Sequence, residues 1–308
     1  MSRPLRIGKI AVGVAFENDG EETPGTRRAL ERAVLLAETS GAAVELVHAA
    51  PWLASSVQDP DARARERAAV RMLERESERF ESCDVRCSCI LVPGSAGVAL
   101  KRAAAVRAAD LVVVGRYDAE RAERGPGHAL LGSTARELIA ECSAPTWIVQ
   151  PTVAPSARAV LAATDLGEVG VRVLAWARML AATFGAELHV LHAWRRPYGA
   201  SAAGEVPDPA ADRRLREQAL RSIERQLEIA GVELERARIH VAGNNPLRAL
   251  RESVARMRPE VLVLGSLSKT GLPGMVLGNT AQGVLEQIDC SLLVIKPEGV
   301  EARLARGA

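Results

Sequence analysis

The feature that most constrains this chain is an internal repeat. Three pairs of segments match: Asp110–Gly115 (DLVVVG) with Glu260–Gly265 (EVLVLG), Gly41–His48 (GAAVELVH) with Gly185–His192 (GAELHVLH), and Ile148–Pro151 (IVQP) with Val294–Pro297 (VIKP). Their spacing of roughly 145–150 residues indicates two copies of one unit of ordinary domain size. We therefore expect two domains, residues 1–151 and 152–308. The seam between them is Pro151–Arg158 (PTVAPSAR), whose prolines and small residues are typical of an extended linker.

Each copy alternates apolar runs with helical patterns. Ile10–Val14 is a continuous apolar run, which is typical of a strand covered on both faces. Thr26–Ser40 has helical spacing and ends before Gly41, a residue suited to a helix C-terminus. The pattern predicts an α/β fold of two tandem Rossmann-like domains, each a five-stranded parallel sheet with helices on both faces. In such a sheet, ligands bind outside the C-terminal ends of the strands.

Composition argues against several classes of function. Lys+Arg number 40 and Asp+Glu 38, and the arginines are scattered rather than gathered in a basic arm, so we expect no nucleic-acid partner. Five unevenly spaced cysteines do not form a disulfide framework, which favours a reducing compartment. No apolar run approaches the ~20 residues of a membrane span. The first residues lack a signal-peptide pattern, so we expect a cytoplasmic protein without membrane contact.

The second copy carries the candidate binding site. A buried strand, Val261–Leu264, leads into a glycine-rich loop that opens onto a helix start at Asn279–Thr280. Free backbone N–H groups and the positive helix end would make this turn an anion cradle. Asp165 ends the first strand of the same copy, where a carboxylate can accept hydrogen bonds from a ribose hydroxyl or an adenine amine. Simpler interpretations remain open: Asp165 could cap a helix that begins near Val169, and the loop could be only a connection.

These residues resemble the universal stress protein family, and in particular its tandem, UspE-like subgroup. The family's nucleotide motif is Gly, two residues, Gly, nine residues, Gly, and Ser or Thr. Here Gly265 and Gly278 keep the spacing, but Ser268 replaces the second glycine and Asn279 replaces Ser or Thr. The resemblance implies binding of an adenine nucleotide, ATP or AMP, with Mg²⁺ if ATP. The implied site consists of Ala163, Asp165, Leu264, Gly265, Leu267, Ser268, Gly278, Asn279 and Thr280.

The first copy departs further from the motif. Gly115 and Gly132 are 17 positions apart (132 − 115), against 13 between Gly265 and Gly278 (278 − 265). Asp118 stands where the second glycine belongs and would repel phosphate. The first strand ends at Phe16 with no carboxylate at the position of Asp165. We predict that this copy binds no nucleotide in the same manner.

Other residues suggest chemistry but lack partners in the sequence. Cys83, Cys87 and Cys89 form C-x3-C-x-C, but no second pair of ligands follows, so buried thiols acting as small hydrophobes are favoured over zinc ligands. His48 and His192 occupy the same position in the two copies, which favours a structural role. His240 ends a strand without an evident partner.

The sequence thus favours a stress-response binding or regulatory module over an enzyme. The last strands, Thr146–Val149 and Leu292–Ile295, are expected at sheet edges, where antiparallel pairing within the chain would cover both. The resemblance also implies a homodimer. Two alternatives remain: a weak ATPase or nucleotidyl-transfer enzyme, and a nucleotide-free protein-interaction scaffold.

Overall fold

In the computed structural model the chain forms two compact units. The structure describes residues 5–17, 21–54, 61–116, 132–151, 159–194, 209–266 and 290–297. The N-terminal unit consists of Arg6–Val153 together with strand β10, and the C-terminal unit is built on Ala154–Cys290. Within these residues no helix has the length and apolar character needed to cross a membrane.

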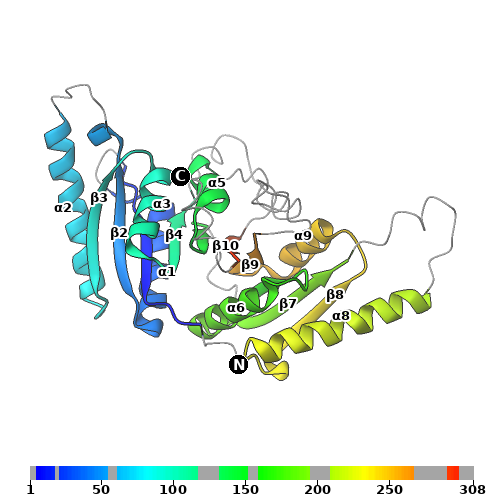
Figure 1. Ribbon diagram of the computed structural model, residues 1–308. Coiled ribbons are helices and arrows are strands. Elements are labelled where there is room, and N and C mark those ends of the chain that lie inside the picture. The colour runs from blue at the N-terminus through cyan, green and yellow to red at the C-terminus, as the bar shows by residue number, and fades with distance from the viewer. Residues whose placement is uncertain are drawn as a thin grey trace. The chain divides into compact units, whose positions relative to one another are not determined.

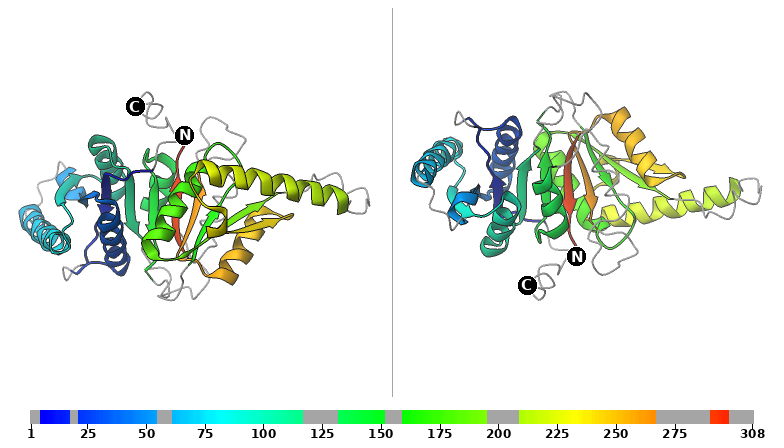
Figure 2. Two further views of the ribbon diagram at one scale, coloured as in Figure 1. Left: turned by 90° about the horizontal axis from the view of Figure 1, so that it is seen from below. Right: turned by 90° about the horizontal axis from the view of Figure 1, so that it is seen from above.

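The N-terminal unit is a doubly wound α/β sheet (Figure 1). Its strands lie in the order β3-β2-β1-β4-β5-β10. Helices α1 and α2 lie on one face, and α3 lies on the other (Figure 2). The elements are β1 (Lys9–Gly13), α1 (Pro24–Ser40), β2 (Ala43–Ala50), η1 (Pro51–Ala54), α2 (Ala62–Glu81), β3 (Cys87–Pro93), α3 (Ala96–Arg107), β4 (Leu111–Gly115), α5 (Ser133–Glu141), β5 (Thr146–Val149) and β10 (Ser291–Ile295).

The C-terminal unit repeats this plan, with strand order β9-β6-β7-β8. Helix α6 packs beside α8, and α9 covers the opposite face of the sheet (Figure 2). The elements are β6 (Ala159–Ala163), α6 (Gly170–Phe184), β7 (Glu187–Ala193), α8 (Pro209–Ile229), η2 (Leu234–Arg236), β8 (Ala237–Ala242), α9 (Pro246–Met257) and β9 (Val261–Gly265). These α/β units with mostly parallel strands confirm the fold class predicted from the repeat.

Continuous apolar runs occupy the central strands because helices cover both of their faces. In β1 and β4, Ile10, Val12, Leu111 and Val113 are fully buried, and in the other unit the same holds for Val160 and Val263. Gly41 and Gly185 end α1 and α6 in the left-handed conformation, with φ of 71° and 59°. Each therefore supplies the helix stop expected from its place in the repeat.

The last strand of the sequence completes the first unit. Strand β10 pairs antiparallel with β5, and Leu293 stands opposite Trp147 in the register. The backbone N–H of Gln150 donates to Ser291 Oγ at 3.1 Å, which fixes the end of this strand pair. The antiparallel pairing of these two strands, expected from the sequence, is confirmed. As a result, β5 is not an edge strand of the N-terminal unit.

Candidate functional site

Four of the nine predicted site residues lie in the described part of the chain. They lie at or just beyond the C-terminal ends of two adjacent strands of the C-terminal unit. Ala163 and Leu264 are register partners on the adjacent parallel strands β6 and β9. Gly265 ends β9, and Asp165 lies two residues beyond β6. The other five predicted residues, Leu267, Ser268, Gly278, Asn279 and Thr280, lie outside the described residues. The described four stand where a doubly wound sheet binds ligands.

Asp165 is solvent-exposed and shapes the turn that follows β6. Its Oδ1 accepts a hydrogen bond of 2.8 Å from the Gly167 amide. The next residue, Leu166, has a φ of 61°, in the left-handed region that non-glycine residues rarely adopt. The N-cap of α6 is Val169, and no side chain caps this helix end. Asp165 therefore holds a turn and does not cap the helix.

A polar network fixes this turn from three elements. Thr164 Oγ1 donates to Gln226 Oε1 at 3.0 Å and accepts from the Leu166 amide at 3.0 Å. Gln226, on α8, also donates from Nε2 to the Gly167 carbonyl at 3.1 Å. His192, on β7, donates from Nδ1 to the Thr164 carbonyl at 2.9 Å. Each partner restrains the backbone on one side of Asp165, so the carboxylate is held at the strand ends before any ligand arrives.

Sequence reasoning missed Thr164 and Gln226 as members of the site. Gln226 directly precedes Leu227 on the long helix, and its bonds to the turn span 59 and 62 positions in the sequence. A polar residue beside an apolar stripe gives no local sign of such a role. The repeated histidine did give a sign, because His48 donates to the Val14 carbonyl at 2.9 Å just as His192 does to Thr164. The expected structural role of this histidine position is supported in both units.

Small residues let the helix and strand ends approach each other at this edge. A Cβ added to Gly170, the first residue of α6, would lie 2.6 Å from Thr164 Oγ1 and 2.5 Å from Gln226 Oε1. A Cβ on Gly265 would lie 3.3 Å from Val169 Cγ1. Next to Gly265, the Ser266 side chain is 1% exposed, and its Oγ has no hydrogen-bond partner among the described residues. An unpaired buried hydroxyl beside the strand ends is a group that a polar ligand could satisfy.

At the corresponding strand ends of the N-terminal unit, the backbone at the start of α1 packs directly against the end of β4. A Cβ on Gly115, at the end of β4, would lie 2.1 Å from the Gly25 carbonyl carbon. The Ala15 amide donates to Thr26 Oγ1 at 3.1 Å, so the start of α1 is tied to the end of β1. Arg116 follows β4 and is 5% exposed. This packing gives a physical reason for the prediction that this unit binds no nucleotide in the same manner; Asp118 lies outside the described residues.

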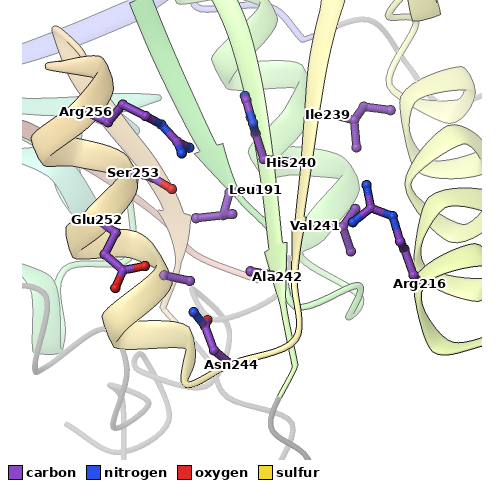
Figure 3. Close-up of a pocket in the computed structure, with 11 residues that line it drawn as sticks. Leu191, Arg216, Ile239, His240, Val241, Ala242, Asn244, Glu252, Ser253 and Arg256 are labelled. Atoms are coloured by element: carbon purple, nitrogen blue, oxygen red, sulfur yellow. The ribbon is translucent and has the colours of Figure 1, made fainter. Parts of the chain in front are cut away.

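A separate cavity of about 280 Å³ opens along the edge strand β8, between α8 and α9 (Figure 3). Figure 3 shows Arg216 reaching it from α8, and Ser253 and Arg256 from α9. His240 lines the cavity from β8. The ring of His240 stacks on that of His189, so the sequence interpretation that left His240 without a partner is wrong.

The three clustered cysteines also differ from expectation. Cys83 is exposed, and Cys87 and Cys89 are partly exposed. They are therefore not buried hydrophobes, because they lie in or next to β3, the outermost strand of the N-terminal unit. Among the described residues, no group of three or more His, Cys, Asp or Glu side chains could hold a metal ion.

Comparison with known proteins places the fold and the repeat in one family. The model of the universal stress protein family matches residues 8–150 and again residues 157–296. A putative universal stress protein from Pseudomonas aeruginosa UCBPP-PA14 is similar in structure, with a TM-score of 0.70 and 18% identity over 97% of both chains. One from Archaeoglobus fulgidus has a TM-score of 0.67 and 18% identity, covering 94% of this chain and 98% of its own.

Several curated relatives carry the name universal stress protein E. That of Photorhabdus laumondii is 28% identical over 178 residues, which are 54% of this chain and 55% of the relative. That of Escherichia coli K12 is 36% identical over 59 residues, or 19% of each chain. The matches therefore span about half or less of these relatives' lengths. With two matched domains that cover most of its length, the chain belongs to the universal stress protein family.

Proposed function

We propose that the C-terminal unit binds an adenine nucleotide, ATP or AMP, and that the protein is a nucleotide-responsive regulatory module rather than an enzyme. The observation that carries the proposal is the fixed, exposed carboxylate of Asp165 at the ends of β6 and β9. A carboxylate there can accept hydrogen bonds from ribose hydroxyls or from the adenine amine. Because the turn is already held by Thr164 and Gln226, little ordering would be needed on binding.

The surroundings suit the rest of such a ligand. Ala163 and Leu264 offer apolar surface next to the carboxylate, against which a base could pack. In the sequence, Gly265 and Gly278 keep the spacing of the first and last glycines of the family motif, and backbone N–H groups of this segment would bind the phosphates. Mg²⁺ would accompany ATP through the phosphate oxygens. In this assignment Asp165 recognises the nucleoside and takes no part in phosphate chemistry.

The test is calorimetric titration of the purified chain with ATP, ADP and AMP, each with and without Mg²⁺. Asp165→Asn removes the charge and keeps the shape, and we expect it to weaken binding about 10-fold or more. Glu168→Gln is the matched control, since Glu168 is an exposed carboxylate in the same turn. Gly265→Val is unsuitable because its side chain would press on Val169. No heat at millimolar nucleotide, or equal losses in the two variants, would overturn the proposal.

The same samples distinguish the enzymatic alternative. Phosphate or pyrophosphate release above the level of the Asp165→Asn variant would favour a weak ATPase or nucleotidyl-transfer enzyme. We propose no turnover, because Asp165, the carboxylate assigned to the nucleoside, would also have to hold the metal ion and position the attacking water. We also propose that the chain forms a homodimer, which sedimentation equilibrium checks directly; a monomer at every concentration would contradict it.

A further inference from the structure

We propose that the cavity along β8 is a second ligand site, which binds a small phosphate monoester that also carries a hydroxyl group. Its volume, about 280 Å³, lies just below the usual range for drug-sized ligands and suits a smaller molecule. None of its lining residues belongs to the nucleotide site proposed above. The polar part of the lining consists of Arg216, His240, Asn244, Glu252, Ser253 and Arg256.

The cavity follows from the spacing of small and polar residues on two facing elements. Four lining residues share one face of α9 at the spacing i, i+3, i+4 and i+7: Ala249, Glu252, Ser253 and Arg256. Opposite them, His240 and Ala242 occupy alternate positions of β8 and therefore share one face of the strand. The two alanines leave the space between helix and strand unfilled. Since β8 is the outermost strand of the described sheet, the cavity stays open on that side.

The charges around the cavity select a dianion. Glu252, the acidic residue of the lining, is engaged by Arg248 at 2.7 Å. Arg216 and Arg256 form no ion pair with a carboxylate among the described residues. Two uncompensated positive charges suit a phosphate monoester, which carries a charge of about −1.5 to −2 at pH 7. A single carboxylate would leave one of the two arginines uncompensated.

Two uncharged polar groups in the lining also need partners. The Ser253 side chain is 4% exposed, and no described residue hydrogen-bonds its hydroxyl. Asn244 Oδ1 is buried, and it has no hydrogen-bond partner among the described residues either. The hydroxyl of Ser253 can donate to a phosphate oxygen held by Arg256, one turn further along α9. Asn244 Oδ1 can only accept, so it needs a donor, which a hydroxyl on the carbon chain of the ligand supplies.

His240 suits the phosphate group in particular. Its Nε2 contacts His189, so Nδ1 is the nitrogen left for a ligand. The second pKa of a phosphate monoester is about 6, close to the ordinary value of about 6.5 for histidine. The ring and the phosphate can therefore share one proton, with either of them as the donor. Figure 3 shows Arg256 reaching from α9 toward the strand that carries His240, so a phosphate between them would contact both.

The test is calorimetric titration of the full chain with glycerol 3-phosphate, inorganic phosphate and glycerol. We expect one molecule of glycerol 3-phosphate to bind per chain, inorganic phosphate to bind more weakly, and glycerol not to bind. Arg256→Gln should weaken both phosphates about 10-fold or more, because a charged hydrogen-bond donor is lost. Asn244→Ala should weaken only glycerol 3-phosphate, since inorganic phosphate has no carbon-chain hydroxyl. Thermal melts check that each variant is folded.

Arg251→Gln is the matched control, because Arg251 is exposed on the same helix and does not line the cavity. Its affinity for glycerol 3-phosphate should equal that of the parent chain. In NMR spectra of the titration, the amide signal of Ser253 should shift, whereas those of Leu166 and Gly167, beside the nucleotide site, should not.

Four results would overturn the proposal. The first is no heat with glycerol 3-phosphate at millimolar concentration, and the second is an equal loss of affinity in Arg251→Gln and Arg256→Gln. The third is malonate bound as tightly as glycerol 3-phosphate, because the site would then not select phosphate. The fourth is a set of NMR shifts confined to Leu166 and Gly167, which would move the ligand to the nucleotide site.

Discussion

His189 Nδ1 lies 2.9 Å from His240 Nε2, and the two imidazole planes are within 9° of parallel. This contact joins β7 to the edge strand β8. Only one of the two nitrogens can carry the proton of the hydrogen bond, so protonation of both rings breaks it. The surrounding charges are Glu187, 3.4 Å from His189 Nε2, and the arginines Arg238 and Arg256.

This histidine pair makes the free energy of unfolding depend on pH. Burial, followed for His240 by the charge of His189, lowers the pKa of both rings. A histidine with a lowered folded-state pKa leaves the unfolded chain binding more protons, so stability falls as pH drops below about 6.5. We expect the free energy of unfolding, from urea melts, to decrease between about pH 6.5 and 5. In the double variant His189→Gln/His240→Gln, the decrease should shrink to the part that His48 contributes. Burial lowers the pKa of His48 as well. An unchanged slope in the double variant would contradict the assignment.

Lys296 gives the free energy of unfolding a second pH dependence, at alkaline pH. Its side chain is 1% exposed, and its ammonium group donates to the Ile139 carbonyl at the end of α5. Burial lowers the pKa of Lys296 to about 8, against the opposing effect of Cys142. An unfolded lysine titrates near pH 10.4, so stability should rise with pH between about 8 and 10. Lys296→Met should remove this rise, while Lys101→Met, in an exposed pair with Glu141, should keep it. Urea melts at pH 7, 8, 9 and roughly 10 check this.

The net effect of Lys296→Met at neutral pH is smaller than the pKa shift alone suggests. Neutralising the buried charge is worth about 3 kcal/mol, but the Ile139 carbonyl loses a donor at a cost of about 1–3 kcal/mol. We therefore expect a gain of about 1 kcal/mol in the free energy of unfolding. A loss of several kcal/mol would mean that the ammonium group is better solvated than its burial indicates.

Cys89 should react as an acidic thiol. The hydrogen bond from Cys87 lowers its pKa to about 7, because it stabilises the thiolate, although burial opposes the shift. The rate of iodoacetamide alkylation at Cys89, followed by mass spectrometry of its peptide, should reach half its maximum near that pH. In Cys87→Ala the midpoint should move toward 9, since the thiol donor is lost. An unchanged midpoint for Cys89 in Cys87→Ala would contradict this cause of the lowered pKa.

Gly115 should tolerate no side chain. The Cβ of Gly115→Ala would lie 2.1 Å from the Gly25 carbonyl carbon and 2.6 Å from the Thr26 nitrogen, so α1 must move away from β4. We expect a loss of about 3 kcal/mol in the free energy of unfolding. Gly132→Ala is the control, because nothing lies within 4 Å of its added Cβ. Equal melting temperatures for the two variants would show that the start of α1 is loosely packed.

The sequence predicted what depends on local pattern. The apolar run Val261–Leu264 and the stop at Gly41 have signatures within a few residues, and the family resemblance implied Ala163 and Leu264, which are register partners on β6 and β9. Contacts between residues far apart in the chain were not predicted. The bond of Thr164 to Gln226 spans 62 positions and that of His189 to His240 spans 51, and neither pair shows in any local pattern. The burial of Cys87 and Cys89 was predicted wrongly because it depends on which strand lies outermost.

The pairing of β10 with β5 has a consequence for synthesis of the chain. Gln150 and its partner Ser291 are 141 positions apart, so the ribosome must make the whole C-terminal repeat before the first sheet receives its sixth strand. Until then β5 presents an open edge to every neighbouring nascent chain. A chain released before residue 291 would therefore keep β5 as an unpaired edge that other chains could extend.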